Sequence, residues 1–121
     1  MTEYLIAFNY EWVPDHTDEE LREKSKAAGG VVAEMKAAGV YIFTGGLHET
    51  TPLFSVDAPG GTPLFTDGPF VETKEHLGGF AVVDVADEEA ARLWAGKIAV
   101  ACGWPQEVYR IHGPGEFPET S

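Results

Sequence analysis

Two helix patterns, each with a strand pattern before and after it, restrict this chain of 121 residues to few folds. The first helix is expected to begin at the capping box of Thr17 and Glu20 and to end at Gly39. The second is expected to follow the capping residue Asp87 and to end at Gly103. Strand patterns cover residues 4–10, 40–44, 51–56, 64–66, 79–85 and 107–112.

This order predicts an α+β fold, a ferredoxin-like antiparallel sheet with two helices on one face. The second and third strands after the first helix are expected to form a hairpin. Apolar residues occur on both faces of the strands, as in the segment from Tyr4 to Tyr10. Two helices can cover only one face of a sheet. The other face needs a second cover, and we expect a second copy of the chain, that is, a homodimer.

The first helix has an apolar stripe and two internal glycines. The stripe consists of Leu21, Ser25, Ala28, Val32 and Met35. Gly29 and Gly30 each cost about 1 kcal/mol relative to alanine within a helix. Either the helix bends there or another backbone passes close, and the sequence leaves both explanations open.

The composition limits the partners. Acidic residues outnumber basic ones by 20 to 8, which gives a formal net charge of −12. Such a charge repels phosphate backbones and anionic lipid surfaces, so we expect neither nucleic acid nor a membrane as partner. No segment approaches the ~18 apolar residues of a membrane span, and the expected location is the cytoplasm. Cys102 is the single cysteine, which excludes an internal disulfide and a cysteine-based metal cluster.

The chain has the length of one domain, and its 44% of hydrophobic residues is typical of a globular protein. We expect this domain to span residues 1–113. Residues 114–121, rich in Gly, Pro and Glu, are expected to form a C-terminal tail.

Residues 65–80, with the sequence FTDGPFVETKEHLGGF, closely resemble the signature of the YCII-related proteins of the DGPF type. Further similarity lies in Ala38-Gly39-Val40, Gly45-Gly46-Leu47-His48, Trp94-Ala95 and Glu107-Val108. The resemblance extends to about His112. It implies a dimeric α+β barrel, in which two ferredoxin-like chains pack sheet to sheet and a cleft lies between the sheet and its loops.

The same resemblance implies little about activity. Most DGPF-type members have no established activity, and many are encoded beside extracytoplasmic-function sigma factors. A related branch includes a dehydrochlorinase that acts on a chlorinated hydroquinone and carries its histidine, part of a His–Asp pair, on the first helix. This chain has no histidine between Asp18 and Ala38, so that pair does not carry over.

Three residues are the candidates for acid–base chemistry: His48, Asp67 and His76. Each lies at the end of a predicted strand or in a loop that leads into one, where functional sites gather. Neutral imidazole can serve as base or acid near pH 7, and a carboxylate can orient it. The structural alternative is that Asp67 bonds the backbone of its own turn and that both histidines are ordinary loop residues.

The sequence gives less support to other kinds of catalytic or binding site. Lys74 could bind a carboxylate or phenolate and Glu72 could accept a proton, but the run from Glu72 to Glu75 equally suits a helical turn or inter-chain salt bridges. His48, Glu49, His76 and Asp67 are metal-compatible residue types without the close histidine spacing of known metal motifs. No phosphate-binding glycine loop occurs. We therefore expect neither a metal nor a cofactor.

Two functions remain. The first is a homodimer that binds a small molecule, with cofactor-free acid–base catalysis of the lyase or isomerase type as its enzymatic form. The second is a non-catalytic regulatory or binding module associated with a sigma-factor system. The sequence does not decide whether the protein is an enzyme.

Overall fold

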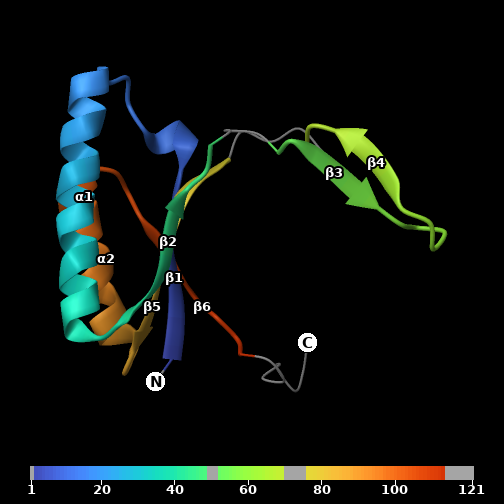
Figure 1. Cartoon of the computed structure of the whole chain (residues 1–121). Coiled ribbons are helices and arrows are strands. Elements are labelled where there is room, and N and C mark those ends of the chain that lie inside the picture. The colour runs from blue at the N-terminus through green and yellow to red at the C-terminus, as the bar shows by residue number, and fades with distance from the viewer. Residues whose placement is uncertain (1, 49–51, 70–75, 114–121) are drawn as a thin grey trace.

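The computed structural model describes residues 2–48, 52–69 and 76–113. In this part of the chain the elements are β1 (Thr2–Asn9), the 3₁₀ helix η1 (Tyr10–Trp12), α1 (Asp18–Ala38), β2 (Tyr41–Gly46), β3 (Phe54–Asp57), β4 (Leu64–Asp67), β5 (Leu77–Val85), α2 (Glu88–Cys102) and β6 (Glu107–Arg110). Figure 1 shows α1 and α2 side by side against one face of the main sheet. Neither helix combines the length and apolar character needed to cross a membrane. The expected tail at 114–121 lies outside the described residues.

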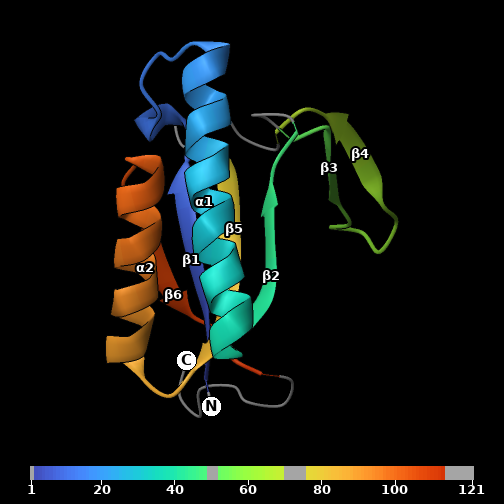
Figure 2. The same cartoon turned by 60° about the vertical axis from the view of Figure 1, so that its left-hand side comes forward.

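The main sheet has four strands in the order β2-β5-β1-β6, and every neighbouring pair is antiparallel. Both helices lie on the same face of this sheet (Figure 2). The predicted α+β fold with ferredoxin-like strand order is confirmed. Strand β1 ends before the predicted Tyr10 because the backbone turns into η1 there. Strand β6 ends at Arg110, although Ile111 N still donates a hydrogen bond to Glu3 O at 2.9 Å.

Both helix starts and stops follow the predicted signals. The Thr17 hydroxyl accepts a hydrogen bond from Glu20 N at 3.1 Å, and Thr17 N donates to Glu20 Oε1 at 3.0 Å, which completes the capping box. Asp87 Oδ1 accepts from Ala90 N at 2.9 Å at the start of α2. The helices end at Gly39 and Gly103, whose φ angles of 75° and 73° lie in the left-handed region that glycine adopts without strain.

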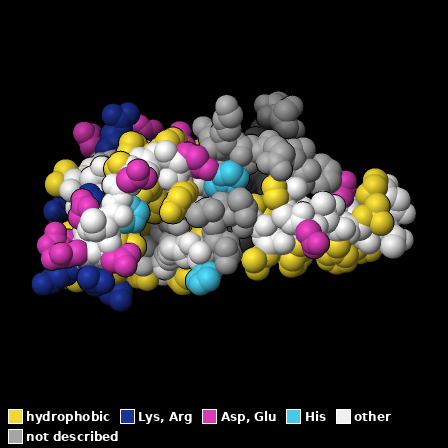
Figure 3. All heavy atoms as spheres, turned by 90° about the horizontal axis from the view of Figure 1, so that it is seen from above, with side chains coloured by type: hydrophobic (Ala, Val, Ile, Leu, Met, Phe, Trp, Pro, Cys, Tyr) yellow, Lys and Arg dark blue, Asp and Glu magenta, His cyan; other side chains and the backbone are white. Residues whose placement is uncertain are grey.

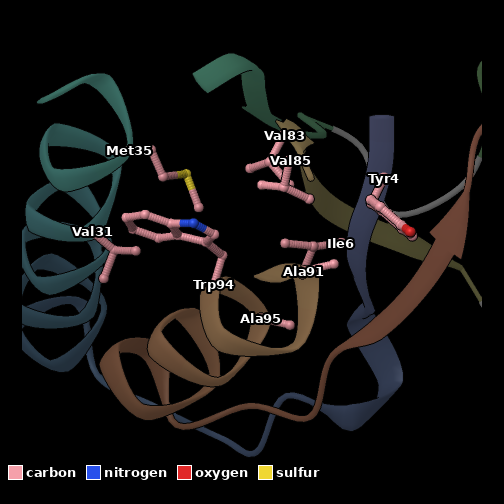
Figure 4. Packing of buried hydrophobic residues seen from close by; sticks show 9 residues of the cluster. All are labelled: Tyr4, Ile6, Val31, Met35, Val83, Val85, Ala91, Trp94 and Ala95. Carbon is pink, nitrogen blue, oxygen red and sulfur yellow. The ribbon is translucent and has the colours of Figure 1, made fainter. Parts of the chain in front are cut away.

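The core lies between the helices and the half of the sheet that contains the start of β1 and the end of β5 (Figure 4). Its buried members are Tyr4, Ile6, Val31, Met35, Val83, Val85, Ala91, Trp94 and Ala95. The predicted apolar stripe of α1 contributes only Met35 to this cluster, at 1% exposed. Leu21, at the other end of the stripe, is 39% exposed. The stripe faces the sheet along its whole length. Side chains from the sheet fill the space between helix and sheet only at the Met35 end of the stripe.

Gly29 and Gly30 do not interrupt α1, which is continuous through both positions. A Cβ atom built on either glycine would meet nothing within 4 Å. The explanation that another backbone passes close is therefore wrong. Gly29 leaves space open on the side of the sheet.

Strands β3 and β4 form a separate two-stranded sheet, which confirms the predicted hairpin. The hairpin projects away from the main sheet (Figures 1 and 2). Its large apolar side chains are exposed, with Leu53 at 75% and Phe65 at 70%. Burial therefore gives this arm little stability within one chain.

The face of the main sheet opposite the helices also carries apolar side chains. Leu5 pairs with Val82 on one side and with Tyr109 on the other, and Phe43 also pairs with Val82. Cross-strand partners share a face, and this set alternates with the core residues of the same strands. Phe43 is 56% exposed, and its ring centroid lies 5.9 Å from that of Phe80. In the described part of the chain no helix covers this face.

Candidate functional site

A cavity of about 610 Å³ lies between α1 and the sheet, at the end where β1 and β2 finish and β5 begins. This end is uppermost in Figure 1. α1 contributes Leu21, Lys24, Ser25, Ala28, Gly29 and Val32 to its wall. The strands contribute Ile6, Phe8, Thr44, Gly45, Gly46, Gly78, Gly79, Phe80 and Ala81, and Ile98, Cys102, Trp104 and Gln106 close the side of α2. Tyr10, Val13, His16 and Leu47 complete the lining.

Glycines explain why this half of the layer is hollow. A Cβ on Gly46 would meet nothing within 4 Å, as for Gly29 across the cavity. Gly78 and Gly79 serve a different purpose, because a Cβ there would lie 2.6 and 2.7 Å from carbons of the Phe8 ring. The ring of Phe8 therefore lies directly on the glycine pair of β5, and it forms part of the cavity wall.

Aromatic and polar groups gather at the side of the cavity near α2. The ring of Trp104 lies 5.0 Å from that of Phe8 and 6.3 Å from the imidazole of His16, measured between centroids. Lys24 Nζ donates a hydrogen bond to the carbonyl oxygen of Cys102 at 2.7 Å and lies 5.8 Å from the centre of the Trp104 ring. Lys24 thus caps the C-terminus of α2, where the partial negative charge of a helix favours a cation.

Trp104 has an unsatisfied donor. The residue is 9% exposed, and its indole Nε1 is buried without a hydrogen-bond partner among the described residues. A buried donor of this kind costs about 1–3 kcal/mol when it lacks an acceptor.

A histidine–carboxylate pair lies beside the cavity. His76 Nδ1 is hydrogen-bonded to Glu11 Oε1, and His76 N donates to Glu11 Oε2 at 2.9 Å. The hydrogen bonds from the His76 side chain and backbone hold the pKa of the Glu11 carboxyl below its usual value of 4.5. Tyr10, a wall residue, donates its backbone N–H to His76 O at 2.8 Å, which fixes the pair at the rim of the sheet.

Two of the three predicted site residues lie at this end of the sheet. His48 follows the end of β2 and His76 precedes β5, and the hydrogen bond from Leu47 N to Gly78 O, at 2.9 Å, joins the two segments. Histidine side chains are visible in the view onto this end (Figure 3). His76 pairs with Glu11 rather than with a residue of the predicted set.

Asp67, the third, ends β4 at the base of the projecting hairpin. Among the described residues, no hydrogen bond or ion pair joins it to His48 or His76. The combined catalytic role of the three residues stays a prediction. Glu49 and the run from Glu72 to Glu75 lie outside the described residues. The described residues contain no group of three or more His, Cys, Asp or Glu side chains arranged to hold a metal ion.

Sequence patterns did not predict Glu11, Lys24 or Trp104 as residues of the site. A signal was present for Lys24, which is spaced three residues after Leu21 and four before Ala28, and so borders the apolar stripe of α1. Trp104 directly follows the glycine that ends α2. No local signal exists for Glu11, because its partner lies 65 residues further along the chain.

The fold and the cavity together define a small α+β protein with ferredoxin-like strand order and a hollow between its two layers. The comparison with known families is more specific. The model of the YCII-related domain matches residues 4–104, so the chain belongs to the YCII-related family. No match was found among curated proteins.

Proposed function

We propose that this protein binds a small molecule in the cavity between α1 and the sheet and that it does so as a homodimer of the DGPF type. The cavity is the observation that carries the proposal. Ligand sites commonly enclose about 300–1,000 Å³, with mostly apolar walls and a few polar groups, and a cavity of about 610 Å³ with this lining fits that class.

A matched pair of glycine variants tests the cavity. In Gly29→Leu the new side chain enters the cavity, whereas in Gly30→Leu it starts from an adjacent helical position outside the wall. The probe is 2-naphthamide, an uncharged flat ring whose binding is followed by isothermal titration calorimetry. A ligand of this size is expected to bind with a dissociation constant of about 1 mM or tighter. We expect binding to the wild type and to Gly30→Leu, and its loss in Gly29→Leu.

Two results would overturn the proposed site. One is a failure of the wild type to bind either naphthamide or its carboxylate analogue, 2-naphthoate. The other is equal binding by the two glycine variants, which would place the probe elsewhere, for example on the exposed apolar hairpin.

The homodimer is supported by the uncovered sheet face. Its apolar side chains, Leu5, Phe43, Phe80, Val82 and Tyr109, offer a second sheet a surface to pack on. On the same face Asp84, which pairs with Glu3, has a carboxylate oxygen that is buried without a hydrogen-bond partner among the described residues. A donor from a second chain would satisfy this oxygen.

Sedimentation equilibrium tests the dimer. We expect a mass of twice the 13.1 kDa of one chain. Phe43→Asp places a charge in the proposed interface and should give monomers, whereas Val100→Asp, at an 85% exposed position of α2, should not. A wild-type protein that stays monomeric at millimolar concentration contradicts this part of the proposal.

Cofactor-free acid–base chemistry is the second candidate function, and the pair of His76 and Glu11 favours it. An ionised carboxylate can only accept hydrogen bonds, so the neutral imidazole carries its proton on Nδ1 and leaves Nε2 as the basic nitrogen. In this proposal His76 is the base of an elimination or isomerisation, Glu11 orients it, and His48 and Asp67 complete the acid–base set.

The nitrogen-15 chemical shifts of the His76 ring test this arrangement. They should report a proton on Nδ1 in the wild type and a mixture of tautomers in Glu11→Ala, because the alanine removes the acceptor. A proton mainly on Nε2 in the wild type would exclude His76 Nε2 as the base.

The regulatory alternative, a module that works with a sigma-factor system in the cytoplasm, also stays a proposal. Co-purification with a sigma factor by the Gly29→Leu variant, at wild-type yield, would support a partner surface independent of the cavity. Absence of a sigma factor from both the purified wild type and the purified variant would count against this alternative.

A further inference from the structure

We propose that the ligand of the cavity is an organic anion with a flat apolar ring, such as an aromatic carboxylate or phenolate, and that the ammonium group of Lys24 binds its charge. This inference rests on the proposed function, because it names the chemical class of the molecule that the same cavity binds.

The charges of the cavity wall are the first argument. Acidic residues number 20 among the 121 of the chain, about one in six, and basic residues number 8. No aspartate or glutamate lies among the described residues that line the cavity, whereas Lys24 and His16 both do. In a chain with a net charge of −12, a wall that contains a cation and no acid is electrostatically suited to an anion.

The position of Lys24 is the second argument. Its hydrogen bond of 2.7 Å to Cys102 O holds the ammonium group at the end of α2, at the edge of the cavity. An ammonium group has three donors, and the Cys102 carbonyl uses one of them. A long lysine side chain that is already held in place loses less conformational entropy when it binds an anion.

The aromatic surroundings give the ligand its second property. The cavity wall contains the rings of Phe8 and Trp104, whose centroids are 5.0 Å apart. The ammonium group of Lys24 lies 5.8 Å from the centre of the Trp104 ring. Flat apolar rings pack well against such surfaces. Trp104 also has the buried Nε1–H that lacks an acceptor among the described residues, and an oxygen anion is the type of group that could accept from it after a small movement of the indole.

The number of positively charged side chains in the cavity wall indicates whether the ligand is an organic monoanion or a phosphate ester. Phosphate sites use several donors, commonly Arg or Lys together with backbone N–H groups at a helix N-terminus or a glycine loop. In the described wall there is one lysine and no arginine, and the helix terminus nearest Lys24 is the C-terminus of α2. This arrangement favours a singly charged carboxylate or phenolate over a phosphate.

The experiment compares two probes of nearly equal shape, 2-naphthoate and the uncharged 2-naphthamide, by isothermal titration calorimetry at low ionic strength. We expect the wild type to bind naphthoate at least tenfold more tightly than naphthamide. Lys24→Met should reduce this ratio to about one, mainly through a loss of naphthoate affinity. Lys24→Arg should retain most of the preference because it keeps the positive charge.

Lys26→Met is the matched control. Lys26 is an exposed residue of the same helix and is not part of the cavity wall, so the variant loses the same charge at a different place. It should keep the preference for naphthoate. A melting curve for each variant checks that the loss of the bond between Lys24 and Cys102 leaves the protein folded.

The outcomes separate this inference from the proposed function. Binding of both probes with equal affinity by the wild type would overturn the anion inference and leave the cavity as a site for neutral ligands. Equal loss of the preference in Lys24→Met and Lys26→Met would overturn the role of Lys24 and indicate a general effect of net charge. Failure of both probes to bind the wild type would overturn the proposed function itself. The wild-type ratio of the two affinities does not depend on whether any variant folds.

Discussion

The layer between the helices and the sheet has two halves that differ in how they are filled. Around Met35, Val83 and Trp94, large side chains from α1, β5 and α2 pack together and exclude water. Around Gly29 and Gly46 the same helix faces the same sheet across an open cavity. The backbone frame is continuous through both halves. Side-chain size alone therefore divides one helix–sheet layer into a part that stabilises the fold and a part that can hold a ligand.

The largest expected effect on stability comes from removing a large side chain from the packed half of the layer. Met35 is 1% exposed, so Met35→Ala should lower the free energy of unfolding by about 2–5 kcal/mol. Val32→Ala, one turn away in the cavity wall, should cost about 1 kcal/mol or less because its methyl groups face open space. Urea denaturation of both variants makes the comparison. Similar losses at the two positions would show that the two halves are equally packed.

The next effect separates two glycines of the hollow half. Gly78→Ala should destabilise the protein by about 1–3 kcal/mol, because its Cβ would lie 2.6 Å from the Phe8 ring and 3.3 Å from Tyr10 N. Gly46→Ala meets nothing within 4 Å and should be neutral or stabilising by up to about 1 kcal/mol. Thermal melting distinguishes them. A neutral Gly78→Ala would mean that Phe8 is not held on the glycine pair.

Alanine at the two glycines within α1 should have a smaller effect, which increases the stability of the protein. Gly29→Ala and Gly30→Ala should each stabilise the protein by roughly 0.5–1 kcal/mol, because alanine has the higher helix propensity and neither position is crowded. Only Gly29→Ala should also weaken the binding of 2-naphthamide. Destabilisation by either variant in urea denaturation would indicate strain in α1 that the structure does not show.

The smallest effect concerns pH at the rim of the hollow half. The hydrogen bonds from His76 hold the pKa of Glu11 below its usual 4.5, so the ionised carboxylate stabilises the folded state. This contribution is fully present above the unfolded-state value and is lost as the pH falls through the lower folded-state pKa. The wild type should therefore lose more stability than Glu11→Gln as the pH falls below 4.5.

Denaturation of the wild type and Glu11→Gln between pH 3 and 7 measures this loss. Replacing His76 with Gln should reduce the pH-dependent difference between the two proteins without abolishing it, because the hydrogen bond from the residue 76 backbone N–H to the Glu11 carboxylate remains. A difference that is undiminished without the imidazole would show that the His76 side chain does not lower the pKa of Glu11.

The arrangement of helices and strands could be predicted from the sequence because the signals for the helix ends are local. Thr17, Gly39, Asp87 and Gly103 mark helix ends through contacts within a few residues, and the order of strands and helices then leaves few topologies. The YCII-related family could also be recognised, since its signature is one continuous run at residues 65–80.

The site could be predicted only in part, because it depends on distant contacts. The stripe from Leu21 to Met35 indicates which side of α1 faces the sheet, but not where the sheet lacks side chains to fill the space. The pairing of Glu11 with His76 depends on the register of β1 and β5, and an irregularity in that register near Phe8 and Asn9 changes which residues meet at the strand ends. Strand patterns in the sequence do not contain this information.

The most direct test of the two-halves account is a nitrogen-15 and proton correlation spectrum of the labelled wild-type protein, titrated with 2-naphthoate. The account predicts large shift changes at Lys24, Gly29, Gly46 and Trp104, and small ones at Val83 and Val85 in the packed half. Changes that concentrate instead on Phe43 and the β3–β4 hairpin, with the cavity wall unaffected, would contradict it.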